Sequence, residues 1–258
     1  MHVWLISTDV PAAVVAELRS TLDDAELARA ATYQRADHQR SYLVAHGAIR
    51  AILADHLGIS PREVRWRAGA HGKPELELSS AGPVPQVSLS RSGALAAFAM
   101  TARRRVGIDL QQPEIGIDVV RMAERYFPPA EASYVASASL ADRASRFFRL
   151  WARKEACVKV DGGLLLSGLR LTVLRTGTVV AGDPAGTTPG PYRIKDVRPP
   201  GQCYAAVAVE GTEPFTVRSH LWPPEGFRWP GHYLYTPVSD GMPTYGRLCP
   251  DVGTLDGR

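Results

Sequence analysis

The sequence predicts an α+β fold made of two similar halves, each with a long helix packed on a small antiparallel sheet. Two helix-like segments, 40–58 and 146–164, both begin with arginine, end near glycine and start 106 residues apart. Two strand-like segments, 92–101 and 200–210, are entered through glycines that lie 108 residues apart. Two pairs of elements at nearly one spacing indicate an internal repeat of a helix-on-sheet unit.

The predicted boundary between the halves lies in RRRVGIDLQ, residues 103–111. We therefore assign residues 1–105 to the N-terminal half and residues 106–222 to the C-terminal half. A ligand site between two such halves would lie in a cleft, where ligand sites are common. Proline and glycine are frequent in the remaining segment, 223–258, so we expect a tail with little regular structure.

The composition is that of a globular protein, with 258 residues, 45% hydrophobic and 22% charged. The first residues, MHVWLISTDVPAAVVAEL, predict a strand rather than a signal peptide, and no apolar run approaches the roughly 20 residues of a membrane span. Cys157, Cys203 and Cys249 are far apart, with neither zinc nor disulfide spacing. We therefore expect a cytoplasmic protein that does not bind membranes.

The net charge of +4 favours an anionic partner. A nucleic acid is the alternative that this charge leaves open, but the arginines are spread along the chain and no helix-turn-helix, zinc or aromatic-basic motif accompanies them, so we expect no nucleic-acid binding. Lysine is scarce, with only Lys73, Lys154, Lys159 and Lys195. The pKa of an ammonium group responds to its surroundings more than that of a guanidinium does. The scarcity of lysine therefore indicates that these four positions specifically require an ammonium group.

Two of the four lysines fall in FFRLWARKEACVKV, residues 147–160. On a helix, Phe147, Trp151, Glu155 and Lys159 share one face because they are four residues apart. The simplest interpretation is an amphipathic helix with an exposed Glu155–Lys159 pair that stabilises it by a few tenths of a kcal/mol. The alternative is a functional carboxylate at Glu155.

The segment VGIDLQ alternates, so that Asp109 and Gln111 lie on the face opposite to three apolar residues. This pattern is typical of a half-buried strand with one wet face. The functional alternative is an oxygen ligand at Asp109, because magnesium is held by one or two carboxylates together with waters and substrate phosphates. Asp109 and Glu155 together would make such a site.

Two further segments carry groups suited to an anion. Lys73 and Pro74 form a turn bracketed by glycine, and VSLSRSG places Ser90 on a serine-lined face beside Arg91. Hydroxyls, backbone amides and a guanidinium would together suit a phosphate. The simpler interpretations are a plain loop for the Lys73 turn and an edge strand for VSLSRSG. For Arg40, on the first long helix, the simpler interpretation is a surface side chain.

Glu131 follows two prolines in FPPAE. A proline pair followed by an acidic residue predicts the start of a helix, where the carboxylate is favourable near the positive end of the helix dipole. A catalytic carboxylate is the alternative.

These segments occur in a fixed order: Gly-Lys-Pro, a serine-rich strand, GIDLQ, FPPAE and WARKEACVK. In that order they resemble the 4′-phosphopantetheinyl transferases, and specifically the larger, single-chain, pseudo-dimeric class that serves polyketide and nonribosomal-peptide carrier domains. The signature of that family reads G-[IV]-D-x-E, followed farther along by W-x-x-K-E-x-x-x-K. Trp151, Lys154, Glu155 and Lys159 fit the second motif, and Asp109 fits the first.

The resemblance covers about residues 1 to 210 and implies a transfer reaction. The phosphopantetheine arm of coenzyme A would move to a serine of an apo-carrier protein, releasing adenosine 3′,5′-bisphosphate in a magnesium-dependent step. It also implies a monomer with the coenzyme between its halves, and acidic carriers that would suit the positive net charge.

The resemblance further implies roles for individual residues. The coenzyme would be held by Arg40, Lys73, Pro74, Ser90 and Arg91. Magnesium would be bound by Asp109, Glu155 and Gln111. Catalysis would rest on Glu155 or Glu131 as the base, Lys159 on the departing bisphosphate, and Lys154 at the same site.

Two residues depart from the family pattern. Gln111 stands where the first motif usually has glutamate, which removes one charge from the cation site. Arg91 stands where many members have histidine, a change that keeps a phosphate-binding cation. The rival hypothesis is a non-catalytic protein of the same fold that binds coenzyme A or a carrier, and Gln111 is the feature that favours it.

Overall fold

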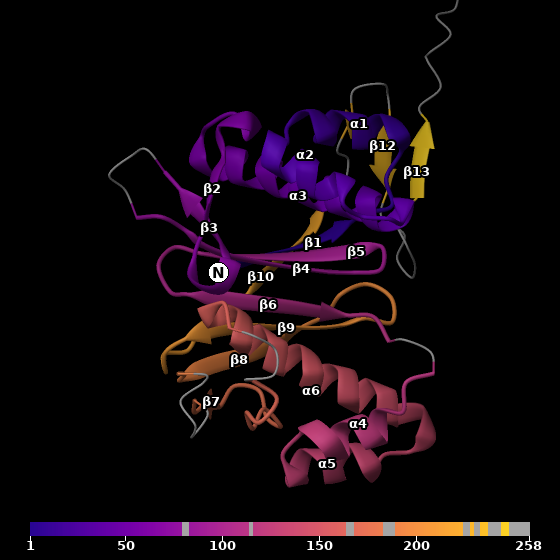
Figure 1. The fold of residues 1–258 in the computed structure, drawn as a ribbon, viewed down its shortest axis with the longest axis vertical. Coiled ribbons are helices and arrows are strands. Elements are labelled where there is room, and N and C mark those ends of the chain that lie inside the picture. The colour runs from indigo at the N-terminus through magenta and orange to yellow at the C-terminus, as the bar shows by residue number, and fades with distance from the viewer. Residues whose placement is uncertain are drawn as a thin grey trace, which may run out of the picture.

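The computed structural model describes residues 1–78, 83–113, 116–163, 168–182 and 189–223, and the backbone of three short strands at 228–229, 233–236 and 244–247. It has the predicted α+β architecture. Two four-stranded sheets lie in the middle, with helices α1 to α3 on one side and α4 to α6 on the other (Figure 1).

The first sheet has the strand order β10–β1–β5–β4. Its strands are β1 (His2–Ser7), β4 (Gln86–Ser92), β5 (Leu95–Thr101) and β10 (Arg218–Trp222). Pairing is antiparallel except between β1 and β10, which are parallel. The expectation of a purely antiparallel sheet is therefore wrong for this edge. Since β10 reaches β1 through a long connection rather than a hairpin, either direction of pairing is open to it.

Three helices cover the outer face of the first sheet: α1 (Ala12–Ser20), α2 (Asp24–Ala31) and α3 (Ala36–Leu57). The start of α2 is fixed by a capping box, in which Asp23 and Glu26 accept each other's backbone N–H groups. The long helix α3 ends at Gly58, whose φ of 68° is in the left-handed region that favours glycine. A hairpin of β2 (Arg65–Ala68) and β3 (Pro74–Glu77) follows and carries the Lys73 turn.

The second sheet is antiparallel throughout, in the order β6–β9–β8–β7. Its strands are β6 (Val106–Gln111), β7 (Val179–Val180), β8 (Tyr192–Val197) and β9 (Tyr204–Glu210). The helices on its outer side are α4 (Val119–Tyr126), α5 (Pro129–Ala136) and α6 (Leu140–Asp161). Proline at the first position of α5 and Gly162 after α6, with φ of 72°, mark the expected helix start and end.

The two sheets share an apolar core. Side chains of β1 and β5 in the first sheet pack on those of β6 and β9 in the second, among them Leu5, Ala97, Ile108 and Val207. Strand β6 thus has apolar side chains against the first sheet, while its other face meets α6. Asp109 is only 2% exposed for this reason, so the expectation of a wet face on this strand is wrong.

The predicted long helices and strands are otherwise confirmed, with α3 and α6 each starting a few residues earlier than expected. The predicted tail contains three short antiparallel strands, β11 (Arg228–Trp229), β12 (Tyr233–Thr236) and β13 (Thr244–Arg247), and its other residues from 224 onward lie outside the described part of the chain. The division into two halves and a tail stays a prediction. No helix in the described part of the chain has the length and apolarity needed to cross a membrane.

Candidate functional site

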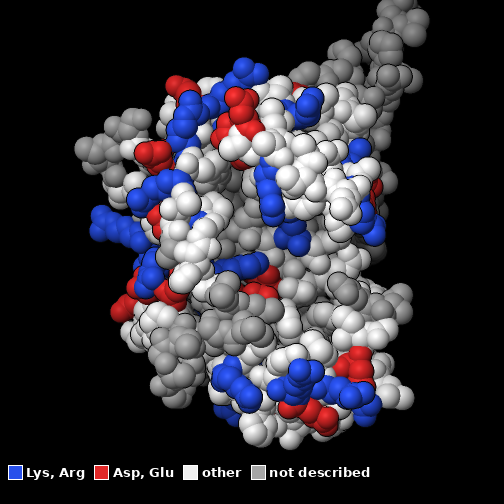
Figure 2. Space-filling model, viewed as in Figure 1, with Lys and Arg blue, Asp and Glu red and all other residues white. Residues whose placement is uncertain are grey.

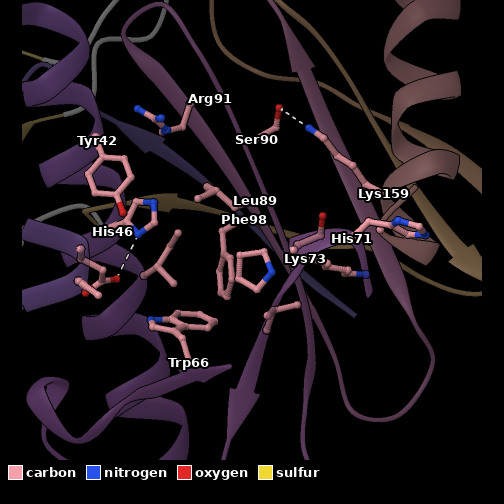
Figure 3. A pocket seen from close by; sticks show the side chains of 18 of the residues that line it. Tyr42, His46, Trp66, His71, Lys73, Leu89, Ser90, Arg91, Phe98 and Lys159 are labelled. Carbon is pink, nitrogen blue, oxygen red and sulfur yellow. Dashed lines mark hydrogen bonds and ion pairs between the residues drawn. The ribbon is translucent and has the colours of Figure 1, made fainter. Parts of the chain in front are cut away.

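A cavity of about 710 Å³ opens between α3, β4, the β2–β3 hairpin and the C-terminal end of α6 (Figure 3). Its apolar wall comes from α3, β2 and the first sheet and includes Ile49, Trp66, Leu89 and Phe98. Its polar and cationic lining is formed by Lys73, Ser90, Arg91 and Lys159. Figure 2 shows Lys and Arg side chains around the hollowed middle of this face, with a further group at the lower end, where α4 to α6 lie and where Asp and Glu side chains are mixed with them.

A hydrogen-bonded cluster joins β4, β6 and α6 at the edge of this cavity. The Lys159 ammonium donates to Asp109 Oδ1 at 2.6 Å and to Ser90 Oγ at 3.0 Å. Ser90 Oγ itself donates to the same Asp109 oxygen at 2.8 Å, and Gln111 Nε2 donates to Asp109 Oδ2 at 2.6 Å. Asp109 is therefore the centre of a cluster whose members come from three separate segments of the sequence.

Close packing of α6 on β6 brings these groups together. Gly107 lies under the helix, and a methyl group there would lie 2.7 Å from the Val160 amide nitrogen and closer still to the Ala156 carbonyl oxygen. Only a residue without a side chain allows this approach. At the other end of α6, Phe147 and Trp151 pack on Phe127 and fix the helix to its neighbours.

Glu155 lies one helical turn before Lys159 on α6. Burial and, after it, the negative charge of Asp109 together raise the pKa of its carboxyl group to about 7, against the opposing effects of Lys159 and of a hydrogen bond from Trp151. A cation bound between two neighbouring carboxylates would offset their repulsion and stabilise the ionised form of both groups. The alternative of an exposed Glu155–Lys159 surface pair is wrong, since the ion pair of Lys159 is with Asp109.

The oxygen atoms in and beside this cluster are suitable ligands for a hard divalent cation. Asp109 and Glu155 offer carboxylate oxygens, and a half-turn of the Gln111 amide would present its oxygen in place of the nitrogen that now faces Asp109. No group of three or more His, Cys, Asp or Glu side chains suited to a metal occurs in the described residues. A cation here would therefore need further oxygens from water or a ligand, as magnesium commonly does.

Lys73 crosses from the β2–β3 hairpin to the second sheet. Its ammonium donates to the Val106 carbonyl at 2.9 Å and to the Val160 carbonyl at 2.8 Å. Burial lowers the pKa of Lys73 to about 8. Two of its three donors are thus used to hold β6 and α6, and the third is left for a group in the cavity that Lys73 lines with Pro74.

Arg91 is placed at the opposite end of the cavity. Its guanidinium donates to the Tyr33 hydroxyl at 2.7 Å and lies over the rings of Tyr33 and Tyr42. Beside it, His46 stacks on Tyr42 with ring centroids 3.9 Å apart and contacts Glu26 at 3.1 Å. The cavity therefore has one end lined by Arg91, aromatic rings and Glu26, and another end lined by Lys73 and Lys159.

Three predicted site residues neither line the cavity nor lie in the Asp109 cluster. Arg40 donates to the Val10 carbonyl and lies 4.0 Å from Asp9, outside the cavity lining. Lys154 and Glu131 form an ion pair of 2.5 Å with both side chains fully buried. Glu131 also accepts from the Val173 N–H, so this pair ties α5 and α6 to the segment after α6.

Sequence reasoning missed several groups that shape the site. Ser88 accepts from the Ile108 N–H at 3.1 Å and Ser92 accepts from the Gln112 N–H at 2.9 Å, so the serine-lined face of β4 binds the backbone of β6. The alternation of serines in VSLSRSG signals this polar face, but the sequence alone predicts a phosphate as its partner rather than the backbone of β6. Arg105 pairs with Asp161 at 2.5 Å at the end of α6, and no pattern in the sequence pointed to that contact.

Comparison with known proteins gives the family of this chain. Residues 105–194 match the family model of the 4′-phosphopantetheinyl transferase superfamily, which spans β6, α6 and the Asp109–Lys159 pair. The 4′-phosphopantetheinyl transferase HetI of Nostoc sp. is 32% identical over 82% of this chain and 88% of its own length. A putative 4′-phosphopantetheinyl transferase of Synechocystis sp. is 29% identical over 67% of this chain and 69% of its own, and the Bacillus subtilis 4′-phosphopantetheinyl transferase is 27% identical over 50% and 55%.

The fold and the site thus define an α+β protein with a phosphate-suited cavity beside an acidic cluster. The chain belongs to the 4′-phosphopantetheinyl transferase superfamily and is an enzyme of that class, as its sequence motifs predict.

Proposed function

We propose that this enzyme transfers the 4′-phosphopantetheine arm of coenzyme A to a serine hydroxyl of an apo-carrier protein, with magnesium, and releases adenosine 3′,5′-bisphosphate. The observation that carries the proposal is the Asp109–Lys159–Ser90 cluster beside Glu155 at the edge of the cavity. It combines carboxylates for a cation with cations for phosphates, which is the equipment that phosphoryl transfer needs.

The cavity would hold the nucleotide part of coenzyme A. Lys73, Ser90 and Arg91 line it and offer an ammonium, a hydroxyl and a guanidinium to its phosphates, while Pro74 fixes the turn that carries Lys73. Arg40 would join them only if it turned away from Asp9 and Val10, and we retain it as a proposed contact at the rim. The two similar halves, and a site in the cleft between them, belong to the same proposal.

Magnesium would be held by Asp109 and Glu155, with Gln111 as a neutral third group. When bound, the metal neutralises charge on the diphosphate oxygens. The missing charge at residue 111 would weaken binding of the cation but leave both carboxylates in place.

In the transfer, a bond forms between the serine oxygen and the β-phosphorus, and the bond from that phosphorus to the bridging oxygen breaks. Glu155 would accept the serine proton, directly or through a water molecule, which needs its carboxylate form. Lys159 would turn to the departing bisphosphate and offset its growing charge. Glu131 and Lys154 would act by positioning α6, since their buried pair contacts neither the cavity nor Asp109.

We assign the enzyme to the larger, single-chain class of the family, acting as a cytoplasmic monomer on carrier domains of secondary metabolite biosynthesis. The net charge of +4 and the Lys and Arg side chains around the hollowed middle of the face in Figure 2 would favour an acidic carrier surface.

Intact-mass spectrometry of an apo-carrier domain incubated with coenzyme A, magnesium and the enzyme tests the proposal. We expect a mass gain of one phosphopantetheine group on the carrier with wild type and with Glu17→Gln, a control on the exposed face of α1. Glu155→Gln and Asp109→Asn should abolish the gain. Binding of coenzyme A without transfer to any of several apo-carriers would instead support the non-catalytic alternative, which the Gln111–Asp109 hydrogen bond favours.

A further inference from the structure

We infer that Lys159 is an internal counter-ion for Asp109, which has to leave that carboxylate before a metal cation can bind there, and that phosphate in the cavity draws it away. The inference rests on the proposed function, because it takes Asp109 as a metal ligand. It adds that the cation and the phosphate bind cooperatively through one side chain.

The first observation is that both Asp109 oxygens already have donors. Oδ1 accepts from Lys159 at 2.6 Å and from Ser90 at 2.8 Å, and Oδ2 accepts from Gln111 at 2.6 Å. A carboxylate has about four acceptor positions, so this buried group has little capacity left. The ammonium at 2.6 Å also carries the charge that a metal would supply, and two cations this close on one oxygen repel each other.

The second observation concerns where Lys159 can go. Its side chain is 30% exposed and lines the cavity, and its other partner is the neutral Ser90 hydroxyl. A phosphate in the cavity would offer this ammonium a new anionic partner within reach of its flexible stem. Moving there would release Oδ1 of Asp109 and remove the competing charge.

The neighbouring lysines lack this freedom. Lys73 is held by two backbone carbonyls, and Lys154 is fully buried against Glu131. Among these three lysines, Lys159 alone joins a carboxylate to the cavity. Because linkage is reciprocal, phosphate should tighten cation binding by the same factor by which the cation tightens phosphate binding.

Metal binding can be measured directly on the coenzyme-free protein. Mn²⁺ is the probe, titrated into the protein while the electron paramagnetic resonance signal of the free ion is followed. Lys159→Met removes the counter-ion and should bind Mn²⁺ on the order of ten- to a hundredfold more tightly than wild type, the range by which a close opposite charge changes a carboxylate's equilibrium. Lys195→Met removes a cation that lies over the Phe215 ring, outside the cluster, so this control should match wild type.

The coupling is measured by repeating the titration with adenosine 3′,5′-bisphosphate, corrected for its own Mn²⁺ binding. This ligand lacks a diphosphate, so it does not chelate the metal as coenzyme A would. Wild type should bind Mn²⁺ more tightly when the ligand is present, and Lys159→Met should lose that gain. Lys159→Gln serves as a second neutral variant, and thermal melts show that each variant is folded.

Unchanged or weaker Mn²⁺ affinity in both Lys159→Met and Lys159→Gln would overturn the inference. It would also be overturned if adenosine 3′,5′-bisphosphate raised the Mn²⁺ affinity of these variants as much as that of wild type. Asp109→Asn separates this failure from failure of the proposed metal site. If Asp109→Asn leaves Mn²⁺ binding intact, the metal does not bind at Asp109 and the proposed site falls. If Asp109→Asn abolishes binding but Lys159→Met does not tighten it, only the counter-ion role falls.

Discussion

Gly107 of β6 lies so close to Ala156 of α6 that the Ala156 carbonyl oxygen leaves no space for a side chain at residue 107. The contact holds the helix that carries Glu155 and Lys159 directly over the strand that carries Asp109. The spacing of the cluster therefore depends on a residue that has no functional group.

Gly107→Ala should destabilise the protein by about 1–3 kcal/mol, because the obstacle to the new methyl group is helix backbone and α6 must move. It should also lower Mn²⁺ affinity, since the shift separates Glu155 from Asp109. Urea unfolding and the Mn²⁺ titration measure the two effects. Gly69→Ala is the control, because the atoms nearest to its methyl group would belong to the flexible Glu75 side chain. Equal losses in both variants would contradict the packing argument.

Glu155 makes stability depend on pH in the metal-free protein. Its pKa of about 7 in the folded protein lies above the unfolded value of 4.5. The contribution of the protonated Glu155 carboxyl group to the free energy of unfolding is therefore present in full below about pH 4.5 and is lost as the pH rises through 7. The free energy of unfolding should fall across this window at up to about 1.4 kcal/mol per pH unit for one proton. Glu155→Gln cannot ionise and should escape the loss.

Melts of wild type and Glu155→Gln between pH 5 and pH 8.5, with a chelator present, measure this difference. The melting temperature of the variant should rise relative to that of wild type as the pH increases, and the difference between the two should become constant above pH 7. A constant gap over the whole range would show that Glu155 ionises normally.

Lys154 and Glu131 should prove strongly coupled. Lys154→Met leaves a fully buried carboxylate without its cation, and breaking a buried pair in this way costs about 3–5 kcal/mol. Adding Glu131→Gln to that variant removes the charge and keeps an acceptor for the Val173 N–H, so it should recover most of the loss. Arg67→Met, which breaks an exposed pair with Glu75, should cost no more than about 1 kcal/mol. Additive costs at 131 and 154 in urea unfolding would contradict the coupling.

Gln111 can be tested by restoring the acidic residue of the motif. Gln111→Glu places a third carboxylate beside Asp109 and removes the donor that now satisfies Oδ2. We expect tighter Mn²⁺ binding and a lower melting temperature without metal, because the new charge is unpaired until a cation arrives. A lower melting temperature with unchanged affinity would mean that residue 111 does not contribute to the metal site.

The elements of the fold could be predicted from local patterns. Glycines at residues 58 and 162, the proline before Glu131 and the apolar alternation of β6 fix where helices and strands begin and end, because such signals act over a few residues. The parallel pairing of β10 with β1 could not be predicted, since nothing near either strand specifies a partner more than 200 residues away.

The sequence by itself determined the chemistry of this protein: which carboxylates, lysines and hydroxyls are present, and that their order is that of the transferase motifs. Only the tertiary structure decided which of them meet. It joins Asp109 to Lys159 rather than Glu155 to Lys159, buries Lys154 with Glu131, and leaves Arg40 outside the cavity. The reason is that residue type fixes what a side chain can bind, whereas its partner depends on how α6 packs on β6, a contact between segments about 50 residues apart.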